Sequence, residues 1–459
     1  MAEQVYDVVI IGGGQAGIPL AGSLAQAGRQ VVVVERKHLG GSCVNFGCTP
    51  TKAVVASAKV AHQARRAAEY GLRVPSVDVD FAAVLERARR ISQNSRTGLD
   101  RRFEGSNNPR LVRGHARLAG RDGDLFRVEA GDEVLKTRQV VLNTGTRSSI
   151  PPIDGLAEVD YLDSENWLDR PELPEHVVMI GGGYVALEMG QIYRRLGSDV
   201  TILERGERVA SHEDEDVAAV IQNVLESEGV GFALNTGIRS VRKDGSGITV
   251  TVDSGSGAHE IRASHLFVAT GRRPNTDDLG LETVGVETTD HGLVGVDERL
   301  ATSVAGIWCA GDIRGGPMFT HTSWDDYRVL ESQMIGDGSR TTKRIIPYAI
   351  FTDPEVGRVG MTEREARQAH ADVKVARVEM RDSSKAIERG ETEGFIKVIV
   401  DAPTDRLLGA TVLAADGSEL VHLYIDLMNA DAPYSVMRDA IHIHPTLAEH
   451  LQTAVTRIG

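Results

Sequence analysis

Two stretches of this chain repeat one pattern of apolar and polar positions. Each begins with a short apolar run, passes through a glycine-rich turn and an amphipathic segment, and ends in a second apolar run followed by an acidic residue. The stretches are residues 6–36, YDVVIIGGGQAGIPLAGSLAQAGRQVVVVER, and residues 175–205, EHVVMIGGGYVALEMGQIYRRLGSDVTILER. Short apolar runs on either side of a helical period predict a β-α-β unit with buried strands in each stretch.

The glycines of both units have the spacing of a dinucleotide-binding fingerprint. Glycines at such a turn let the backbone approach a pyrophosphate at the helix N-terminus, and the acidic residue after the second strand accepts hydrogen bonds from a ribose. One copy is weak support, because glycine-rich turns also occur where nothing binds, but two copies with matched spacing predict two bound dinucleotides. The predicted residues are Gly12, Gly14, Gly17 and Glu35 in the first unit and Gly181, Gly183 and Glu204 in the second, where Ala186 takes the place of the third glycine.

Outside the two units the pattern changes. Apolar runs that close with Thr-Gly, at 144–145 and 270–271, are expected to be the last strands of the two nucleotide-binding segments. Alternating stretches within 107–138 and 230–262 predict antiparallel strands. After about residue 340 no glycine fingerprint recurs, and a hairpin followed by helices is expected. The predicted fold class is α/β, with two Rossmann-like dinucleotide-binding domains and a C-terminal α+β domain.

The composition narrows the function. The 459 residues are enough for about three domains of roughly 150 residues each. A formal charge of −14 disfavours nucleic acid and anionic membranes as main partners, because both attract clustered Lys and Arg. No stretch approaches the ~18 apolar residues of a membrane span, and the opening MAEQVYDVVIIGGG lacks the basic start of a signal peptide. Three cysteines do not make a disulfide framework, so the predicted location is a reducing compartment, the cytoplasm.

Two of the three cysteines, Cys43 and Cys48, follow the first unit in the stretch GGSCVNFGCTPTKA. Pro50 and the helix-forming run after it predict that Cys48 lies at a helix N-terminus, where the helix dipole favours a thiolate. The four intervening residues allow the two sulfur atoms to reach bonding distance. A zinc site would need two more ligands, and Cys309 lies in an apolar stretch, GIWCAGD, typical of a core strand. A redox-active pair is the favoured interpretation, with a structural disulfide or two inert thiols as alternatives.

Six motifs resemble those of the FAD-dependent pyridine nucleotide–disulfide oxidoreductases, the family of glutathione reductase, dihydrolipoamide dehydrogenase and mercuric reductase. The motifs span nearly the whole chain and are GGGQAG, GGSCVNFGCTPTK, GGGYVALEMG, VATGRRPN, GIWCAGD and HIHPTLAEH. The resemblance implies that one dinucleotide is FAD and the other NAD(P)H, and that the C-terminal domain joins two chains in a homodimer. The implied domains are an FAD-binding domain in residues 1–150 and 271–340, an NAD(P)H-binding domain in 151–270 and an interface domain in 341–459.

The resemblance also implies roles for the residues around the cysteine pair. Cys43 resembles the interchange thiol that attacks the substrate, and Cys48 the thiol that faces the flavin and gives a charge-transfer band when reduced. Lys52 and Glu188 resemble the ion pair beside flavin N5, and Tyr184 the aromatic gate over the nicotinamide pocket. A solvated helix residue is the alternative interpretation of Lys52, and a packing residue that of Tyr184.

Further cofactor contacts follow from the same motifs. Asp312 resembles the carboxylate that binds the ribityl chain, and Glu35 the one that binds the adenosine ribose. Glu204 favours NADH, because a carboxylate bonds the ribose 2′-hydroxyl and repels a 2′-phosphate, whereas the adjacent Arg205 could accommodate NADPH. The remaining residues expected at the cofactors are Thr144, Gly145 and His321 for FAD and Gly271 for NAD(P)H.

The motif HIHPTLAEH supplies a candidate acid/base pair. Pro445 is expected at the first position of a helix, and Glu449 in the next turn and a half can orient the imidazole of His444. The resemblance implies that this His comes from the second subunit and shuttles a proton to and from the interchange thiol. A surface or capping histidine is the alternative, and His442 and His450 are less favoured for the catalytic role.

The expected activity passes electrons from NAD(P)H through FAD and the disulfide to a small thiol-reactive oxidant or disulfide, with no metal ion. One alternative is dihydrolipoamide dehydrogenase, which the His444–Glu449 motif, Glu204 and the resemblance of GGPMFTHTS support. Another is a mercuric reductase without the terminal cysteines, which FTDPEVGRVG resembles. Efficient Hg(II) reduction is not expected, because thiolates must carry this soft ion and the chain has no terminal cysteine pair or cysteine-bearing N-terminal domain.

The resemblance that extends furthest is to the mercuric-reductase-like branch of reactive-chlorine-resistance proteins, the hypothiocyanous acid reductases. It is carried by GIWCAGDIRGG, SWDDYRV, PYAIFTDPEVGRVGMTEREAR and APYSVMRDAIHIHPTL. Another reductase of low-molecular-weight disulfides stays open within the family. From a different class, the alternative is a flavin diaphorase or oxidase that does not use the cysteines.

Overall fold

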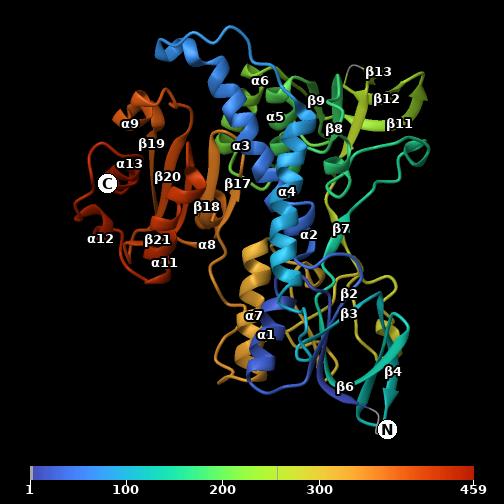
Figure 1. Ribbon diagram of the computed structural model, residues 1–459. Helices are drawn as coiled ribbons and strands as arrows, with labels where there is room; N and C mark the ends of the chain where they lie inside the picture. The colour runs from blue at the N-terminus through green and yellow to red at the C-terminus, as the bar shows by residue number, and fades with distance from the viewer. Residues whose placement is uncertain (1–3, 256, 459) are drawn as a thin grey trace.

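The computed structural model describes residues 4–255 and 257–458, and its strands form parallel and antiparallel sheets. Figure 1 shows these sheets in three parts, with the orange to red C-terminal part at the left and the two parts built on the repeated units at the right. This arrangement confirms the predicted α/β fold class with a C-terminal α+β domain.

The first repeated unit lies at the centre of a seven-stranded sheet. Its strands are β1 (Val5–Ile11), β2 (Val31–Glu35), β3 (Arg110–Arg113), β4 (Ala116–Asp122), β5 (Leu125–Ala130), β6 (Glu133–Leu142) and β16 (Ile307–Cys309). The order is β3-β2-β1-β6-β5-β4, and β16 also pairs with β6. The neighbours of β1, which are β2 and β6, are parallel to it, whereas β5 is antiparallel to both β4 and β6. The apolar runs of β1 and β2 are buried because helices α1 (Gly17–Gln26) and α7 (Thr320–Met334) pack together on one face of the sheet.

The second repeated unit forms a parallel four-stranded sheet with the order β10-β9-β8-β14. Its strands and helices are β8 (His176–Ile180), α5 (Tyr184–Leu196), β9 (Asp199–Leu203), α6 (Glu215–Ser227), β10 (Val230–Ala233) and β14 (His265–Val268). An antiparallel sheet adjoins it and consists of β11 (Gly237–Asp244), β12 (Gly247–Ser254) and β13 (Gly257–Ala263). The pair β7 (Thr146–Ser148) and β15 (Arg272–Pro274) connects the two repeated units.

The C-terminal part is an antiparallel sheet with the order β17-β18-β21-β20-β19. The strands are β17 (Tyr348–Ile350), β18 (Glu355–Gly360), β19 (Val373–Glu379), β20 (Phe395–Asp401) and β21 (Arg406–Ala414). The helices around it are α8 (Glu363–Ala369), α9 (Ser384–Glu388), α10 (Gly417–Leu420), α11 (His422–Asn429), α12 (Ser435–Arg438) and α13 (Leu447–Thr456). Short 3₁₀ turns along the chain are η1 (Ala67–Tyr70), η2 (Leu156–Glu158), η3 (Trp167–Asp169), η4 (Leu281–Thr283), η5 (Asp312–Arg314) and η6 (Met380–Asp382).

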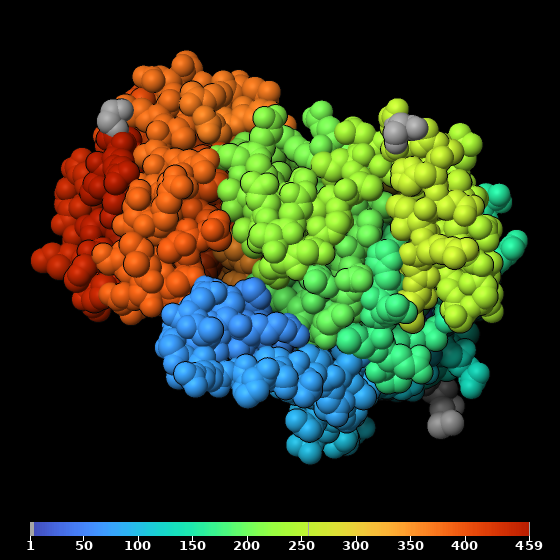
Figure 2. Space-filling view, turned by 90° about the horizontal axis from the view of Figure 1, so that it is seen from above, coloured from blue at the N-terminus to red at the C-terminus, as the bar shows by residue number. Residues whose placement is uncertain are grey.

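The helices that follow the first unit join all three parts. They are α2 (Gly41–Asn45), α3 (Cys48–Arg65) and α4 (Phe81–Asp100). One buried apolar cluster contains Val54 of α3, Leu187 of α5 and Val356 of β18, so the same core is shared by residues far apart in the chain. Seen from above, the light-blue surface of α3 and α4 borders both the green second unit and the orange C-terminal part (Figure 2). Among the described residues, no helix is both long and apolar enough to cross a bilayer.

Candidate active site

The two glycine turns have the same geometry, and each needs a residue without a side chain at its first position. Gly12 has φ +108°, and a Cβ atom there would lie 2.2 Å from the carbonyl oxygen of Asn143. Gly181 has φ +103°, and a Cβ atom there would lie 2.6 Å from the carbonyl oxygen of Ala269. Close backbone approach at a left-handed turn therefore explains both glycines.

The acidic residue at the end of each unit is tied to its glycine turn. The Glu35 carboxylate accepts the N–H of Gly13 at 2.8 Å, and the Glu204 carboxylate accepts the N–H of Gly182 at 2.6 Å. Each carboxylate accepts one further backbone N–H from the residue two positions later. Since a carboxylate has about four acceptor sites, both can still bind ribose hydroxyls.

Asn143, which sequence reasoning missed, connects the first turn to the strands behind it. Its Oδ1 accepts the N–H of Gly17 at 3.0 Å, and its Nδ2 donates to the carbonyl of Ala310 at 2.9 Å. The signal was present, because this polar residue interrupts an apolar run directly before Thr144. Its role depends on a helix and a strand far apart in the chain, so the local pattern did not reveal it.

A cavity of about 1100 Å³ runs from the first glycine turn to the cysteine pair. Its lining contains twelve of the predicted site residues, namely Gly12, Gly14, Glu35, Cys43, Cys48, Lys52, Thr144, Gly145, Tyr184, Glu188, Asp312 and His321. Gly17 lies behind the turn, where it is buried. A ribose-binding carboxylate at one end and a thiol pair at the other fit an extended dinucleotide whose reactive ring reaches the sulfur atoms.

The cysteine pair lies where α2 meets α3. Cys43 is within α2, and Cys48 is the first residue of α3, as predicted. Both are free thiols in this structure, and the hydroxyl of Thr320 lies 3.2 Å from the Cys48 sulfur. The hydrogen bond from Cys43 lowers the pKa of Cys48 to about 6, with Thr320 and Lys52 acting in the same direction against burial. The hydrogen bond with Cys48 and burial raise the pKa of Cys43, so the proton stays on Cys43 and the thiolate is Cys48.

An ion pair between α3 and α5 borders the cysteines. Lys52 Nζ lies 2.6 Å from Glu188 Oε2, with the two side chains 32% and 5% exposed. Phe351 contacts both partners, since its N–H donates to Glu188 Oε1 at 2.9 Å and its ring centroid lies 4.3 Å from Lys52 Nζ. Lys52 is therefore a paired residue of the cavity wall and not a freely solvated helix residue. Phe351 was not predicted, because only the fold brings it to this pair.

Other predicted residues surround the same end of the cavity. Asp312 begins η5 and accepts a hydrogen bond from Thr146 Oγ1 at 3.2 Å, and burial raises its pKa. His321 Nε2 lies 2.6 Å from the carbonyl of Pro347, so this ring is held against the start of the C-terminal part. Tyr184 is the first residue of α5 and is 41% exposed. The side chain of Tyr184 is thus at the boundary between the cavity and the second unit.

The remaining residues predicted for the second dinucleotide lie outside this cavity, around the turn of the second sheet. Gly183 is the N-cap of α5, and Gly271 follows the end of β14 with φ +105°. Glu204 closes the unit, and the next residue, Arg205, is exposed. The two predicted dinucleotide sites are therefore formed by different residues, and Tyr184 lies between them.

The predicted acid/base pair is formed, but it lies away from the cysteines of its own chain. His444 Nδ1 is 2.9 Å from Glu449 Oε2, and the His444 side chain is 68% exposed. Neither residue is among the described residues that line the cavity. The prediction that Pro445 starts the helix was wrong: α13 begins two residues later, because the Thr446 hydroxyl caps it by accepting the N–H of Glu449.

The fold and the cavity together define a class of protein. The structure contains two dinucleotide-type turns, a dithiol with one acidic thiol at the end of the cavity, and a lysine–glutamate pair beside the dithiol. These are the parts of a dinucleotide-dependent dithiol–disulfide oxidoreductase. Among the described residues, no cluster of three or more His, Cys, Asp or Glu side chains is arranged to hold a metal ion.

Comparison with known proteins identifies the family. Residues 6–326 match the family model "Pyridine nucleotide-disulphide oxidoreductase", and residues 346–455 match its dimerisation domain. The chain is 33% identical over 451 residues to the probable pyridine nucleotide-disulfide oxidoreductase RclA of Escherichia coli K12, covering 97% of this chain and 98% of that one. It is 34% identical to a mercuric reductase of Streptomyces lividans, covering 99% and 96%.

A solved structure, the HOCl-induced flavoprotein disulfide reductase RclA from Escherichia coli, superposes with a TM-score of 0.89 at 32% identity, covering 99% of this chain and all of that one. The chain therefore belongs to the pyridine nucleotide–disulfide oxidoreductase family, whose members are FAD-dependent oxidoreductases that use NAD(P)H. The resemblance inferred from the sequence motifs is confirmed, including the likeness to the reactive-chlorine-resistance branch and to mercuric reductase. The dimerisation domain indicates a homodimer.

Proposed function

We propose that this enzyme uses NADH to reduce a small thiol-reactive oxidant, such as hypothiocyanous acid, through the Cys43–Cys48 pair. The observation that carries the proposal is the pairing of a low-pKa thiolate, Cys48, with a protonated thiol, Cys43, at the end of the cavity. The likeness to a flavoprotein disulfide reductase induced by HOCl supports an oxidant of this size and chemistry. Such an oxidant needs a reactive thiol and no large recognition pocket.

The residues that line the cavity of about 1100 Å³ fit FAD. The first unit supplies the pyrophosphate turn and Glu35 for the ribose, and Asp312 lies near the far end for the ribityl chain. Bound FAD supplies two-electron transfer between the nicotinamide and the disulfide. The proposed FAD residues are Gly12, Gly14, Gly17, Glu35, Thr144, Gly145, Asp312 and His321, within residues 1–150 and 271–340.

The second unit, within residues 151–270, is proposed to bind the nicotinamide nucleotide, with Gly271 just beyond it. Its carboxylate, Glu204, occupies the place at which a 2′-phosphate would be repelled, which supports NADH. Arg205 is exposed beside it and would favour NADPH if its side chain turned to the ribose. The proposed residues are Gly181, Gly183, Tyr184, Glu204, Arg205 and Gly271. The cytoplasmic location expected from the sparse cysteines stays a prediction.

The reaction with hypothiocyanous acid can be written for the residues of this chain. Because Cys43 holds its proton, a base must take it, and we assign this step to His444 of the partner subunit, oriented by Glu449. Cys43 then attacks the oxidant's sulfur, and the leaving hydroxide takes the proton to become water. The Cys48 thiolate attacks the Cys43 sulfur and expels thiocyanate, which re-forms the disulfide. The dithiol is oxidised by two electrons and one oxidant molecule becomes thiocyanate and water.

The charge-transfer band of the two-electron-reduced enzyme is expected to titrate with a midpoint near pH 6. The band requires the Cys48 thiolate, whose pKa is lowered to about 6, so absorbance is full above this pH and is lost as the pH falls through it. Spectrophotometric titration of the anaerobically reduced enzyme measures the midpoint. The Thr320→Val variant, which lacks the hydroxyl near the sulfur, should titrate at higher pH. A midpoint near the ordinary thiol value of about 8.5 would contradict this assignment.

The substrate is tested by steady-state NADH oxidation in separate assays with hypothiocyanous acid, lipoamide and Hg(II) at equal concentration. The expected result is turnover within the ~10–10³ s⁻¹ of ordinary enzymes for the oxidant and negligible turnover for lipoamide. The opposite result would make the enzyme a dihydrolipoamide dehydrogenase, and activity confined to Hg(II) would make it a mercuric reductase. The same assay with NADPH tests the nucleotide preference, and the Cys43→Ser enzyme is the blank for direct reaction between oxidant and NADH.

A further inference from the structure

One face of α5 holds the segment that leads from β17 into β18. Glu188, Gln191 and Arg195 are spaced i, i+3 and i+7, so their side chains lie along the same side of the helix. All three bind the Phe351–Asp353 segment by hydrogen bonds. The C-terminal part of the chain is therefore fixed to the helix that carries Glu188.

At the end of this contact nearest the cysteines, the segment touches both members of the Lys52–Glu188 pair. Glu188 is nearly buried, and each of its carboxylate oxygens has one partner, Lys52 Nζ on one and the Phe351 N–H on the other. The Phe351 ring is within cation–π distance of the Lys52 ammonium. One residue thus fixes the anion through its backbone and the cation through its side chain.

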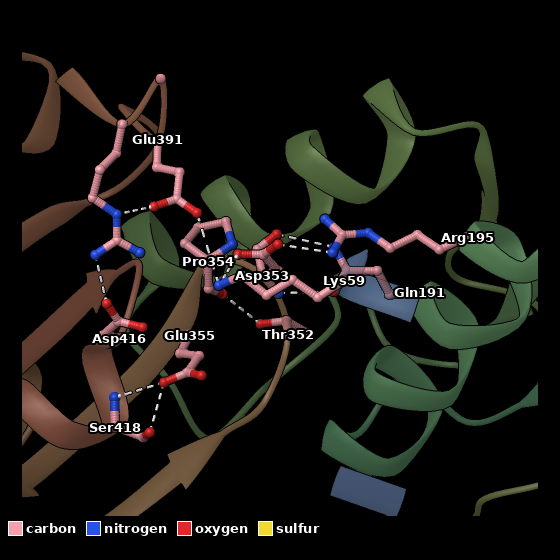
Figure 3. Close-up of polar contacts among 12 residues, drawn as sticks. Lys59, Gln191, Arg195, Thr352, Asp353, Pro354, Glu355, Glu391, Asp416 and Ser418 are labelled. Carbon is pink, nitrogen blue, oxygen red and sulfur yellow. Dashed lines mark hydrogen bonds and ion pairs between the residues drawn. The ribbon is translucent and has the colours of Figure 1, made fainter. Parts of the chain in front are cut away.

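At the other end, Asp353 is held from two helices (Figure 3). Its N–H donates to Gln191 Oε1 at 2.8 Å, and its carbonyl accepts from Gln191 Nε2 at 2.9 Å. Its carboxylate lies 2.8 Å from Arg195 and 3.6 Å from Lys59 of α3. Desolvation opposes the charge, but Arg195 and Lys59 outweigh it and lower the pKa of Asp353. Asp353 therefore stands as a charged anchor between α3 and α5.

Lys52 and Lys59 are seven residues apart on α3, so both face α5 and the segment. Two ion pairs, Lys52–Glu188 and Lys59–Asp353, therefore follow one another along α3. Phe351, which contacts the first pair, and Asp353 of the second pair belong to the same short segment. A shift of that segment would move Phe351, which contacts both members of the first pair, together with Asp353, which is a member of the second. The Lys52–Glu188 pair is thereby in direct contact with the C-terminal part of the chain through Phe351.

We propose that Phe351 and Asp353 are positioning residues for the Lys52–Glu188 pair, and that they set how strongly Lys52 stabilises negative charge on the reduced flavin and on the Cys48 sulfur. This inference rests on the proposed role of the pair beside the flavin. The alternative is that the segment only holds the C-terminal part to α5, in which case its loss would lower thermal stability and leave the electrostatics of the site unchanged.

The test uses the FAD-loaded dimer and two variants, Phe351→Leu and Asp353→Asn. Phe351→Leu removes the ring over Lys52 and keeps the backbone N–H, and Asp353→Asn removes the anchoring charge and keeps the backbone contacts to Gln191. Both are expected to shift the flavin reduction equilibrium against a reference dye about tenfold toward the oxidised form, which is ~30 mV for two electrons. The pH midpoint of the charge-transfer band should rise in both variants. Phe351→Tyr, which keeps an aromatic ring over Lys52, should show the wild-type equilibrium and midpoint.

A matched control breaks a charged contact between the same parts of the chain away from the pair. Arg377→Gln removes the contact between β19 and Asp216 of α6, 3.0 Å long, and is expected to leave the dye equilibrium and the midpoint unchanged. If Phe351→Leu and Asp353→Asn change only the melting temperature, the positioning role is overturned. Lys52→Met distinguishes failure of the positioning role from failure of the proposed role of the Lys52–Glu188 pair. If Lys52→Met shifts the dye equilibrium and the midpoint while the segment variants do not, only the positioning role is wrong. If Lys52→Met shifts neither, the proposed role of the pair is wrong.

Discussion

The Cys48→Ser enzyme is expected to lose NADH-dependent reduction of its oxidant by about a thousandfold or more, because Cys48 is the thiolate proposed to face the flavin and to close the disulfide. Anaerobic NADH should still bleach its flavin, since hydride transfer from the nicotinamide to the flavin comes before the step that uses the sulfur. The long-wavelength charge-transfer band should be absent at every pH. Titration with NADH under argon, followed by absorbance, measures both effects in one experiment.

The partner cysteine gives the opposite spectrum. In Cys43→Ser the Cys48 thiolate cannot be consumed in a disulfide, so the band is expected even before NADH is added, while turnover is lost to the same extent. Cys309→Ala is the matched control, because Cys309 is a fully buried core residue of β16 and should keep both the activity and the band. Identical bleaching and undiminished turnover in wild type and Cys48→Ser would instead identify a diaphorase that does not use the cysteines.

The parts of the site that the sequence predicted are those encoded locally. The glycine turns need residues without side chains at fixed positions, and the two cysteines and the helix start at Cys48 lie within one short stretch. Hydrophobic periodicity was sufficient for the two parallel units, because buried parallel strands are continuous apolar runs. For these features the residues close together in the sequence are sufficient to specify the local structure.

The residues that sequence reasoning missed act between distant segments. Asn143 joins a strand end to the first helix, and Phe351 binds Glu188, from which it is 163 residues distant in the chain. Nothing in the neighbouring residues specifies those contacts, because the first depends on the pairing of β6 with β1 and β16 and the second on how the C-terminal sheet packs on α5. The strand order β17-β18-β21-β20-β19 is non-local in the same way. Pro445 shows a local error, since the competing signal of Thr446 as an N-cap decided where α13 starts.

The exposed His444–Glu449 dyad supports the proposal that a second chain completes the active site. The imidazole is in hydrogen-bond contact with its carboxylate and yet is 68% exposed, and Ile441 and Ile443, which precede it, are 100% and 79% exposed. Exposed aliphatic side chains next to a formed acid/base pair are typical of a surface that a partner covers. Because the protonated Cys43 needs a base, His444→Ala is expected to lower turnover by about 10²- to 10⁴-fold.

His444→Ala should leave NADH reduction of the flavin intact, since the affected step is the proton transfer at Cys43. Stopped-flow measurement of the reductive half-reaction beside steady-state turnover separates the two. His442→Ala is the matched control in the same loop, because His442 has no carboxylate partner among the residues that the structure describes, and it should retain turnover. Glu449→Gln keeps the shape of the dyad, removes its charge and should give a smaller loss than His444→Ala.

Hybrid dimers decide whether the dyad acts across the interface. Subunits carrying Cys43→Ser and subunits carrying His444→Ala are inactive as separate homodimers, but a mixed dimer contains one site that has both an intact Cys43 and the intact His444 of the partner subunit. Random exchange of equal amounts should therefore restore about a quarter of the wild-type sites, measured as turnover after denaturant-free mixing or co-expression. If His444 served its own chain, every site of the mixed dimer would lack one of the two groups, and mixing would restore no activity.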